Sequence, residues 1–240
     1  MRLRFALLLF IFFLPAVISP ARPYAQDEAA TIDVSRIPAE AGDVNGFVPK
    51  GWKIEERVTG DLNGDAVPDY ALKLVEDKPE KTADDEATER GRALVVVLAG
   101  KGGKLARAGV ADRLLQCTRC GGAFYGVVES PANVKIEKGV LVVDQDHGSR
   151  DVTETTYRFR YDPGAGRFAL IGFDLTDNDR LTANTVAEST NYLTGLRVTT
   201  RGKNGRDRSS RAQVTRAKIY MEQVDAGKFE QDAYERLHLN

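Results

Sequence analysis

The sequence predicts a mainly β protein, an antiparallel sheet or sandwich-like meander that ends in a short C-terminal helix. Three observations lead to this fold class. Apolar residues recur with a period of two from Phe47 onward, which is typical of strands that are buried on one face. Two segments in the middle of the chain have hairpin signatures. Helical spacing of apolar residues is confined to residues 228–239.

Two predicted strands lie on either side of a charged segment. Tyr70, Leu72 and Leu74 alternate along the first strand, and the continuous apolar run at residues 93–99 is typical of a buried strand. Residues 76–92, between the two, are densely charged and have no apolar face. We therefore expect an exposed, mobile loop there, and we assign it no function.

The later strands are predicted as hairpins. One hairpin turns at Lys138 and Gly139, and a second turns at residues 162–166, where Asp, Pro and Gly supply turn chemistry. Further along, the patterns of residues 191–200 and 212–224 predict two more strands, which flank a polar segment.

The first 25 residues are predicted to be a secretory signal peptide. Arg2 and Arg4 give a positive start, an apolar stretch follows, and Ala25 is a candidate for the last residue removed. The alternative is a membrane anchor, but an uninterrupted span needs about 20 apolar residues, and Pro15 interrupts this stretch. We therefore expect a periplasmic or secreted protein without a transmembrane segment in the mature chain.

Composition places the mature chain among globular proteins. The full chain has 29% charged and 42% hydrophobic residues, a balance that suits one sizeable domain. Residues 26–45 lack periodicity and predict a flexible tail, and residues 46–240 predict a single β-rich domain. The leader contains arginines but no acidic residue, so its removal leaves a mildly acidic chain. The overall charge therefore does not favour nucleic-acid binding.

The segment after residue 60 carries the clearest candidate for a metal site. Counted from Asp61, side-chain oxygens fall at positions 1, 3, 5 and 9, and a main-chain carbonyl is available at position 7. Calcium takes about six to eight oxygen ligands from a chain that can wrap around it, which this spacing allows. The predicted ligands of a structural calcium ion are Asp61, Asn63, Asp65, Val67 and Asp69.

The loop DLNGDAVPD resembles the calcium loop of FG-GAP and VCBS repeats, D-x-D/N-x-D-G-x-x-D, which leads into a strand. An EF-hand is excluded, because position 12 is Leu72 rather than a bidentate Glu. Ala66 stands where the resembled family usually has glycine. Short segments between Phe47 and Gly195 also resemble secreted or periplasmic bacterial proteins of this kind, which have no assigned activity.

The resemblance implies a calcium-associated β fold and no particular reaction. Members with many repeats form propellers of about four to eight blades, but the acidic loop occurs once here, so a complete propeller is not expected. A polar turn without metal is the alternative, because Asp and Asn side chains readily bond nearby backbone amides. Three carboxylates that converge without a cation would repel one another, however, and this favours calcium.

The two cysteines, Cys117 and Cys120, allow three interpretations. We favour a local disulfide, because cysteine pairs outside the cytoplasm are usually oxidised. A redox pair would need a helix where Gly121 and Gly122 follow. A structural zinc site needs four ligands and would use both cysteines together with His147 and His238.

The sequence offers little for catalysis. His147 lies near Asp146 and Ser149, but neighbouring side chains on a strand point to opposite faces, and we interpret this trio as a solvated corner. The chain contains no Gly-x-Ser-x-Gly, His-Glu-x-x-His or phosphate-cradling motif. Paired carboxylates for glycoside hydrolysis stay open as an alternative, because their pairing in space is invisible in a sequence.

A basic cluster suggests binding to anions. Its members concentrate around a predicted hairpin tip, where they could contact an anionic polymer or lipid headgroups, although a solvated loop is the simpler interpretation. Residues 193–219 contain no aromatic residue that could stack on a base, which disfavours single-stranded nucleic acid. The candidate residues are Arg201, Lys203, Arg206, Arg208 and Arg211.

These observations together favour a non-catalytic role. We expect an exported, calcium-stabilised interaction or envelope-associated module, whose partner is an envelope or extracellular protein or a polyanion. The alternative is a hydrolase that acts on an extracytoplasmic polymer. A deep pocket with two facing carboxylates would favour the hydrolase, and an exposed basic segment at residues 201–211 would favour binding.

Overall fold

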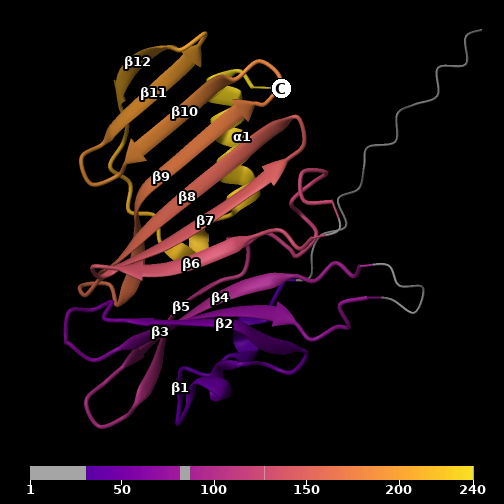
Figure 1. Cartoon of the computed structure of the whole chain (residues 1–240). Coiled ribbons are helices and arrows are strands. Elements are labelled where there is room, and N and C mark those ends of the chain that lie inside the picture. Colours follow the sequence, from indigo (N-terminus) through magenta and orange to yellow (C-terminus); the bar gives the residue numbers. More distant parts are fainter. Residues whose placement is uncertain (1–30, 82–86, 127, 240) are drawn as a thin grey trace, which may run out of the picture.

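The structure is a computed structural model that describes residues 31–81, 87–126 and 128–239. The predicted signal peptide and the first residues of the predicted tail lie outside the described residues. The described chain forms two antiparallel sheets and has a short α-helix near its C-terminal end (Figure 1). The mainly β fold class that the alternating pattern predicts is therefore confirmed.

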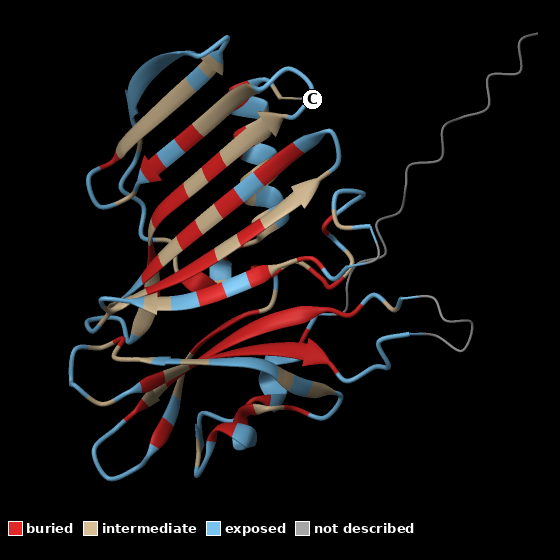
Figure 2. Ribbon diagram, viewed as in Figure 1, coloured by how far each residue is buried: buried red, intermediate tan, exposed pale blue. Residues whose placement is uncertain are grey.

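The first sheet has five strands in the order β1-β5-β4-β3-β2. Its central strands, β3 and β4, are buried along nearly their whole length on both faces, as the red ribbons of Figure 2 show. This explains why residues 93–99 form a continuous apolar run rather than an alternating one. The strands are β1 (Glu40–Ala41), β2 (Trp52–Gly60), β3 (Asp69–Glu76), β4 (Arg92–Ala99) and β5 (Leu105–Ala111).

The second sheet is a seven-stranded meander in which every strand pairs with its neighbours in the sequence. Buried and more exposed residues alternate along β8, which is the burial pattern of a sheet with one covered face (Figure 2). The strands are β6 (Ala132–Glu137), β7 (Val140–Gly148), β8 (Asp151–Asp162), β9 (Arg167–Asp179), β10 (Asn184–Asn191), β11 (Leu196–Lys203) and β12 (Arg206–Gln213).

The helix α1 (Ala226–Leu237) covers one face of the second sheet, behind it in the view of Figure 1. The carboxylate of Asp225 caps its first turn, and His238 ends it in the left-handed conformation with φ of 55°. Ala233 and Leu237 bury the inner side of the helix in the core of the second sheet. The C-terminal helix predicted from apolar spacing is confirmed.

The hairpins in the middle of the chain form as predicted, but the last one is placed differently. Lys138 and Gly139 join β6 to β7, with φ of 51° and 75°. The prediction of a strand at residues 212–224 is wrong. Asn204 and Gly205, with φ of 52° and 70°, turn the chain back early, so β12 occupies most of the polar segment that was expected to be a loop.

The described part of the predicted tail is folded. A short 3-10 turn (Val34–Arg36), the strand β1 and a second 3-10 turn (Val44–Phe47) lie against the outer face of the first sheet. Ile37 and Phe47 have exposed fractions of 2% and 0%. The folded domain therefore begins before the expected boundary at residue 46, because these isolated apolar side chains complete a core that their local sequence does not reveal.

The two ends of the charged segment at residues 76–92 are buried, contrary to the prediction, whereas residues 77–81, 87 and 89 are exposed as predicted. Glu76, Arg90 and Arg92 have exposed fractions of 8%, 4% and 5%. The carboxylate of Glu76 accepts the Gly91 N–H at 2.8 Å, and Arg90 pairs with Glu129. Tertiary partners distant in sequence thus compensate for the burial of these charges. The middle of the segment, residues 82–86, lies outside the described residues.

The two sheets meet where β2 lies against β6. A Cβ atom added to Gly60 at the end of β2 would lie 2.6 Å from Cγ2 of Ile136 on β6, so only glycine allows this close approach. A shared core then continues from the inner face of the first sheet into the covered face of the second. The metal loop predicted from the sequence begins directly after this contact.

Candidate metal loop, polar groove and basic hairpin

The acidic loop joins β2 to β3 and curls around the side chain of Asp61. One carboxylate oxygen of Asp61 accepts the N–H of Gly64 at 2.7 Å, and the other accepts the N–H of Ala66 at 3.0 Å. These backbone donors, the Gly64 N–H first, lower the pKa of Asp61 below its ordinary value. Asp61 is therefore held as a carboxylate at the start of the loop.

The next two predicted ligands are braced within the loop. The side-chain oxygen of Asn63 accepts the Asp65 N–H at 3.0 Å, and a carboxylate oxygen of Asp65 accepts the Val67 N–H at 2.8 Å. The intervening Leu62 is turned the other way, into the core, with an exposed fraction of 3%. Leu62 therefore separates Asp61 and Asn63 on the side away from the core, whereas Ala66 and Pro68 further along the loop are exposed.

Asp69 closes the loop from a fully buried position. Its two carboxylate oxygens accept the N–H groups of Leu62 and Ala99, each at 2.8 Å. Burial raises the pKa of Asp69, the two N–H donors oppose this shift, and the nearby Asp65 and Asp61 carboxylates add to it. A cation beside Asp69 would offset the free-energy cost that burial and the neighbouring carboxylates impose on its charged form.

The departure from the resembled pattern falls on a strained residue. Ala66 adopts a φ of 65°, in the left-handed region, where the family pattern has glycine. Gly64 also has a positive φ, of 83°. The backbone therefore follows the path that glycine would favour, and Ala66 bears a conformational cost of about 1–2 kcal/mol.

The donor set of the loop fits calcium. Every side-chain donor is an oxygen, and each carboxylate oxygen that accepts one N–H retains a second lone pair for a cation. The carboxylate oxygens of Asp61, Asp65 and Asp69 do not all lie within 4.8 Å of one another. Among the described residues, the group that meets this distance consists of Glu89, Cys117 and Cys120. Binding of a cation by all three carboxylates would therefore require the loop side chains to move closer together.

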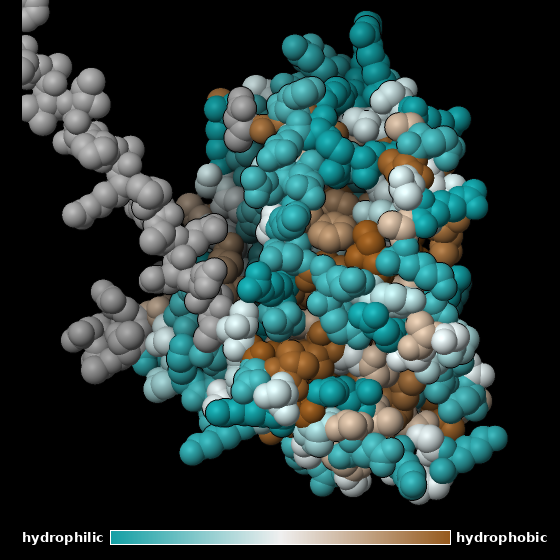
Figure 3. Space-filling model, turned by 180° about the vertical axis from the view of Figure 1, so that it is seen from behind, coloured by the Kyte–Doolittle hydropathy of each residue, from teal (hydrophilic) through white to brown (hydrophobic). Residues whose placement is uncertain are grey.

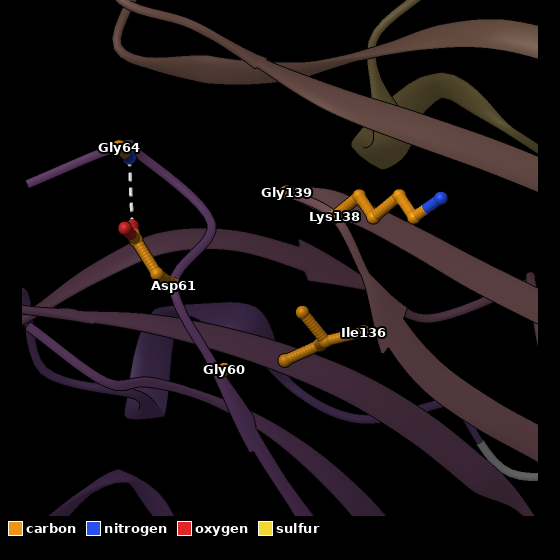
Figure 4. Close-up of a pocket in the computed structure, with 6 residues that line it drawn as sticks. All are labelled: Gly60, Asp61, Gly64, Ile136, Lys138 and Gly139. Atoms are coloured by element: carbon orange, nitrogen blue, oxygen red, sulfur yellow. Dashed lines mark hydrogen bonds between the residues drawn. The ribbon is translucent and has the colours of Figure 1, made fainter. Parts of the chain in front are cut away.

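An open cavity adjoins the loop on its solvent side. It has a volume of about 520 Å³ and lies between the loop and the β6–β7 turn. In Figure 4 the carboxylate of Asp61 points to Gly64, whereas the side chain of Lys138 extends away from it. The nearest turn therefore does not place its ammonium group on the carboxylate that begins the candidate site.

The cysteine pair forms the predicted local disulfide. The sulfur atoms of Cys117 and Cys120 are 2.07 Å apart, within a tight turn. The carboxylate of Glu89 lies within 4.8 Å of both sulfurs. The alternative zinc site is not assembled in the described part of the chain, because His147 bonds to Glu230 and His238 caps α1.

The structure gives His147 a partner that the sequence does not indicate. Its Nε2 lies 2.8 Å from a carboxylate oxygen of Glu230 on α1. The hydrogen bond to Glu230 is the main cause that raises the pKa of His147, and burial opposes it. The interpretation of this segment as a solvated corner is wrong for His147, whereas Asp146 lies on the opposite face of β7, as the alternation of strand side chains predicts, and bonds to Tyr125. His147 is thus a half-buried link to the helix.

A polar network continues from this link under the helix. The hydroxyl of Thr153 bonds to Asp177 at 3.1 Å and also to Tyr234 of α1. Burial raises the pKa of Asp177, and burial also raises the pKa of Tyr234 to about 12. Three polar side chains therefore help to seat the helix on a sheet whose covered face is otherwise mainly apolar.

A groove of about 1010 Å³ runs between the disulfide turn and the first turns of α1. Its walls carry three carboxylates, but two of them have partners. Asp225 caps the helix and pairs with Arg113, and Glu230 pairs with His147. The third carboxylate is that of Asp232. The groove thus lacks the free, facing pair of carboxylates expected for the hydrolase alternative.

The predicted anion-binding residues lie along both strands of one hairpin, and Lys203 and Arg206 flank its Asn204–Gly205 turn. Arg201 and Lys203 belong to β11, and the other three belong to β12, whose eight residues are all exposed. Arg201 differs from the rest, because its guanidinium donates to the main-chain oxygen of Leu237 at 2.7 Å. The structure therefore brings all five predicted residues together on one edge of the second sheet: Arg201, Lys203, Arg206, Arg208 and Arg211.

No protein-family model and no curated protein matches this chain. The likeness of the acidic loop to FG-GAP and VCBS repeats therefore stays a prediction that depends on the residues of the loop itself. Within the described residues, no helix is long and apolar enough to cross a membrane.

Proposed function

We propose that the protein is an exported module in which calcium, bound at residues 61–69, stabilises a β-rich fold that serves non-catalytic interactions at the cell envelope or outside the cell. The observation that carries this proposal is the division of the loop: Leu62 is buried, while the flanking side chains present oxygens on the other side. The disulfide supports an address outside the cytoplasm.

Calcium would act on the fold by tying the end of β2 to the start of β3. Asp61 follows β2 directly, and Asp69 is the first residue of β3. A cation shared by the two carboxylates would replace their repulsion with attraction. Sites in extracellular modules bind calcium at roughly 10⁻⁴ to 10⁻³ M, so calcium at tenfold the dissociation constant would add about 1.4 kcal/mol to the free energy of unfolding.

The calcium proposal is tested by thermal unfolding of the mature chain with and without millimolar calcium. We expect calcium to raise the melting temperature by about 3–5 °C, given about 1.4 kcal/mol in a chain of this size. Asp65→Ala should abolish the rise, because its carboxylate contacts the loop alone and its loss leaves the core intact. Titration calorimetry should show the same loss of binding.

The matched control is Asp232→Ala, which removes an exposed carboxylate from α1, far along the chain from the loop. This variant should retain the full calcium-dependent rise. An unchanged melting temperature of the wild-type chain at millimolar calcium would overturn the metal proposal. Equal responses of Asp65→Ala and the wild type would place the ion elsewhere.

The hydrolase alternative finds less support in the groove. Two of its three carboxylates are engaged, Asp225 as the cap of α1 and Glu230 as a partner of the His147 imidazole. The exposed basic hairpin, in contrast, supports an interaction role. We therefore propose binding rather than catalysis.

A further inference from the structure

The strand β12 forms an open edge of the second sheet. It pairs with β11 on one side, and the other side has no neighbouring strand in the described chain (Figure 1). All eight of its residues are exposed, as the pale blue ribbon of Figure 2 shows. Such an edge presents unpaired main-chain N–H and C=O groups, to which another extended chain can add.

The basic side chains on this edge have no partners in the described chain. Lys203, Arg206, Arg208 and Arg211 make neither a hydrogen bond nor an ion pair with their side chains among the described residues. Basic residues nearby are engaged, as for Lys218, whose ammonium lies 2.9 Å from Asp162. The hairpin therefore holds four cations that the rest of the fold leaves without anions.

The register of the hairpin places like charges opposite each other. Arg201 faces Arg208, and Lys203 faces Arg206. Directly opposite cross-strand side chains lie about 4.5–5.5 Å apart at Cβ, and like charges there are destabilising. The helix relieves Arg201 through the Leu237 oxygen, but the other three side chains receive no such relief. A bound anion would remove this repulsion.

The distribution of charge over two faces indicates the shape of the anion. Arg206 and Arg208 lie on one face of β12, and Arg211 lies on the other, because successive side chains of a strand alternate. A ligand that rests on one face would reach part of this set. An extended chain beside β12 would instead place its own alternating side chains next to the cations on both faces.

We infer that β12 is a docking strand, to which an extended acidic segment of a partner protein adds as a further strand. This inference rests on the interaction role proposed above and names its partner class. Main-chain hydrogen bonds along the edge would supply affinity, and carboxylates opposite Arg206, Arg208 and Arg211 would supply specificity.

A membrane surface fits the hairpin less well. The large apolar side chains that are exposed in the described chain all lie outside β11 and β12, so the hairpin has no group to insert among acyl chains. The rear face of the molecule likewise shows separate hydrophobic patches divided by hydrophilic residues (Figure 3). The exposed large apolar residues are Val34, Phe124, Val128, Leu181 and Leu193.

The competing explanation is that the charges only prevent the open edge from pairing with other chains. Natural proteins place charged residues on edge strands for this purpose. That role does not require Lys203 on the inner strand β11 to face Arg206. Edge protection also predicts that β12 binds neither acidic nor neutral strands, whereas a docking strand binds acidic ones. Peptide binding therefore distinguishes the two explanations.

The test measures binding of a fluorescent peptide of about ten residues with the repeat Thr-Glu-Glu (the Thr–Glu peptide), which has carboxylates on both faces of a strand, by anisotropy, to the full mature chain. A Thr–Gln peptide with the repeat Thr-Gln-Gln removes the charge. A Pro–Glu peptide with the repeat Pro-Glu-Glu keeps the charge but places prolines, which have no N–H, on both of its edges, so neither edge can pair continuously. Vesicles of phosphatidylglycerol test the membrane source. We expect binding of the Thr–Glu peptide alone, with slower amide exchange in residues 206–213.

The variant for the test is the triple change Arg206→Glu, Arg208→Glu and Arg211→Glu. We expect it to bind the Thr–Glu peptide at least about tenfold more weakly, which corresponds to about 1.4 kcal/mol. Its matched control reverses three exposed lysines elsewhere, Lys50, Lys104 and Lys228, to Glu, and should bind as the wild type does. Circular dichroism of each variant verifies its fold.

Several outcomes would overturn the inference. Equal binding of the Thr–Glu and Pro–Glu peptides would show attraction by charge without strand addition. Binding to vesicles but not to the peptide would assign the hairpin to membranes. Absence of peptide binding by the wild type would leave edge protection as its role. The calcium-dependent rise in melting temperature is measured separately, so failure of the docking strand and failure of the metal proposal are distinguishable.

Discussion

At the scale of single residues, the two aspartates at the ends of the loop at residues 61–69 have a structural role in addition to their predicted role as ligands. Asp61 and Asp69 lie at the ends of the predicted ligand set. Each carboxylate accepts hydrogen bonds from two backbone N–H groups and so holds the loop in place. The spacing in the sequence predicts both residues as ligands of a cation. It did not predict that Asp69 also joins the loop to Ala99 of the neighbouring strand.

Ala66→Gly is predicted to stabilise the chain. The left-handed φ of 65° strains alanine by about 1–2 kcal/mol, and the greater freedom of glycine in the unfolded chain offsets about 0.5–1 kcal/mol of that gain. We expect a net gain of about 0.5–1 kcal/mol in urea unfolding without calcium. Ala183→Gly, at another residue with positive φ, is the control, since it should stabilise without altering the calcium response. Destabilisation by Ala66→Gly would refute the assigned strain.

At the scale of elements, α1 is seated by polar as well as apolar contacts. Phe229 packs edge-on against Tyr157 and Phe173, while Glu230 reaches His147. The pKa of His147 is raised above its ordinary value of 6.5, so the protonated imidazole is favoured by the folded state. This pair therefore stabilises the docked helix fully below pH 6.5, and the stabilisation is lost as the pH rises through the higher folded pKa.

His147→Gln is predicted to flatten this pH dependence. Glutamine can donate to Glu230 but does not titrate. Melting temperatures of the wild type should therefore fall more steeply than those of the variant as the pH rises from about 6.5. His238→Gln, which changes the residue that ends the helix, is the control for a general loss of histidine charge. Parallel profiles of wild type and His147→Gln would contradict the assignment.

At the scale of the whole molecule, buried charges join the two sheets. A β-bulge between Ile54 and Glu56 turns Glu55 toward Arg92, whose guanidinium donates two hydrogen bonds of 2.7 Å to the carboxylate. The same guanidinium donates to the Ser130 oxygen at 2.8 Å, just before β6. Arg92 thus ties the first sheet to the start of the second.

Arg92→Ala is predicted to cost about 3–5 kcal/mol, because it leaves the Glu55 carboxylate without its partner in a largely buried position. The loss should appear in the free energy of unfolding by urea. Lys135→Ala breaks a pair with Asp144 whose lysine side chain is 54% exposed, and it should cost no more than about 1 kcal/mol. Equal effects of the two changes would show that burial of Arg92 does not govern its contribution.

Local periodicity and turn chemistry were enough to predict the features that depend on residues close together in the chain. The alternating strands, the β6–β7 turn, the C-terminal helix and the position of the acidic loop follow from residues close together in the chain. One local prediction, the strand at residues 212–224, was wrong. The Asn204–Gly205 turn was treated as part of a loop, so the strand β12 was predicted too late in the chain. The local signal was present there, since Asn-Gly is a strong hairpin dipeptide.

Tertiary structure alone decided the pairings between distant segments. His147 meets Glu230, Arg92 meets Glu55, and Phe47 completes the outer core, and in each case the partners approach only when separate elements pack. The energy of burying a charge or an apolar side chain depends on the surroundings that packing creates. The four cations around β12, in contrast, receive no side-chain partner from packing within the described chain, and their strand stays an open edge.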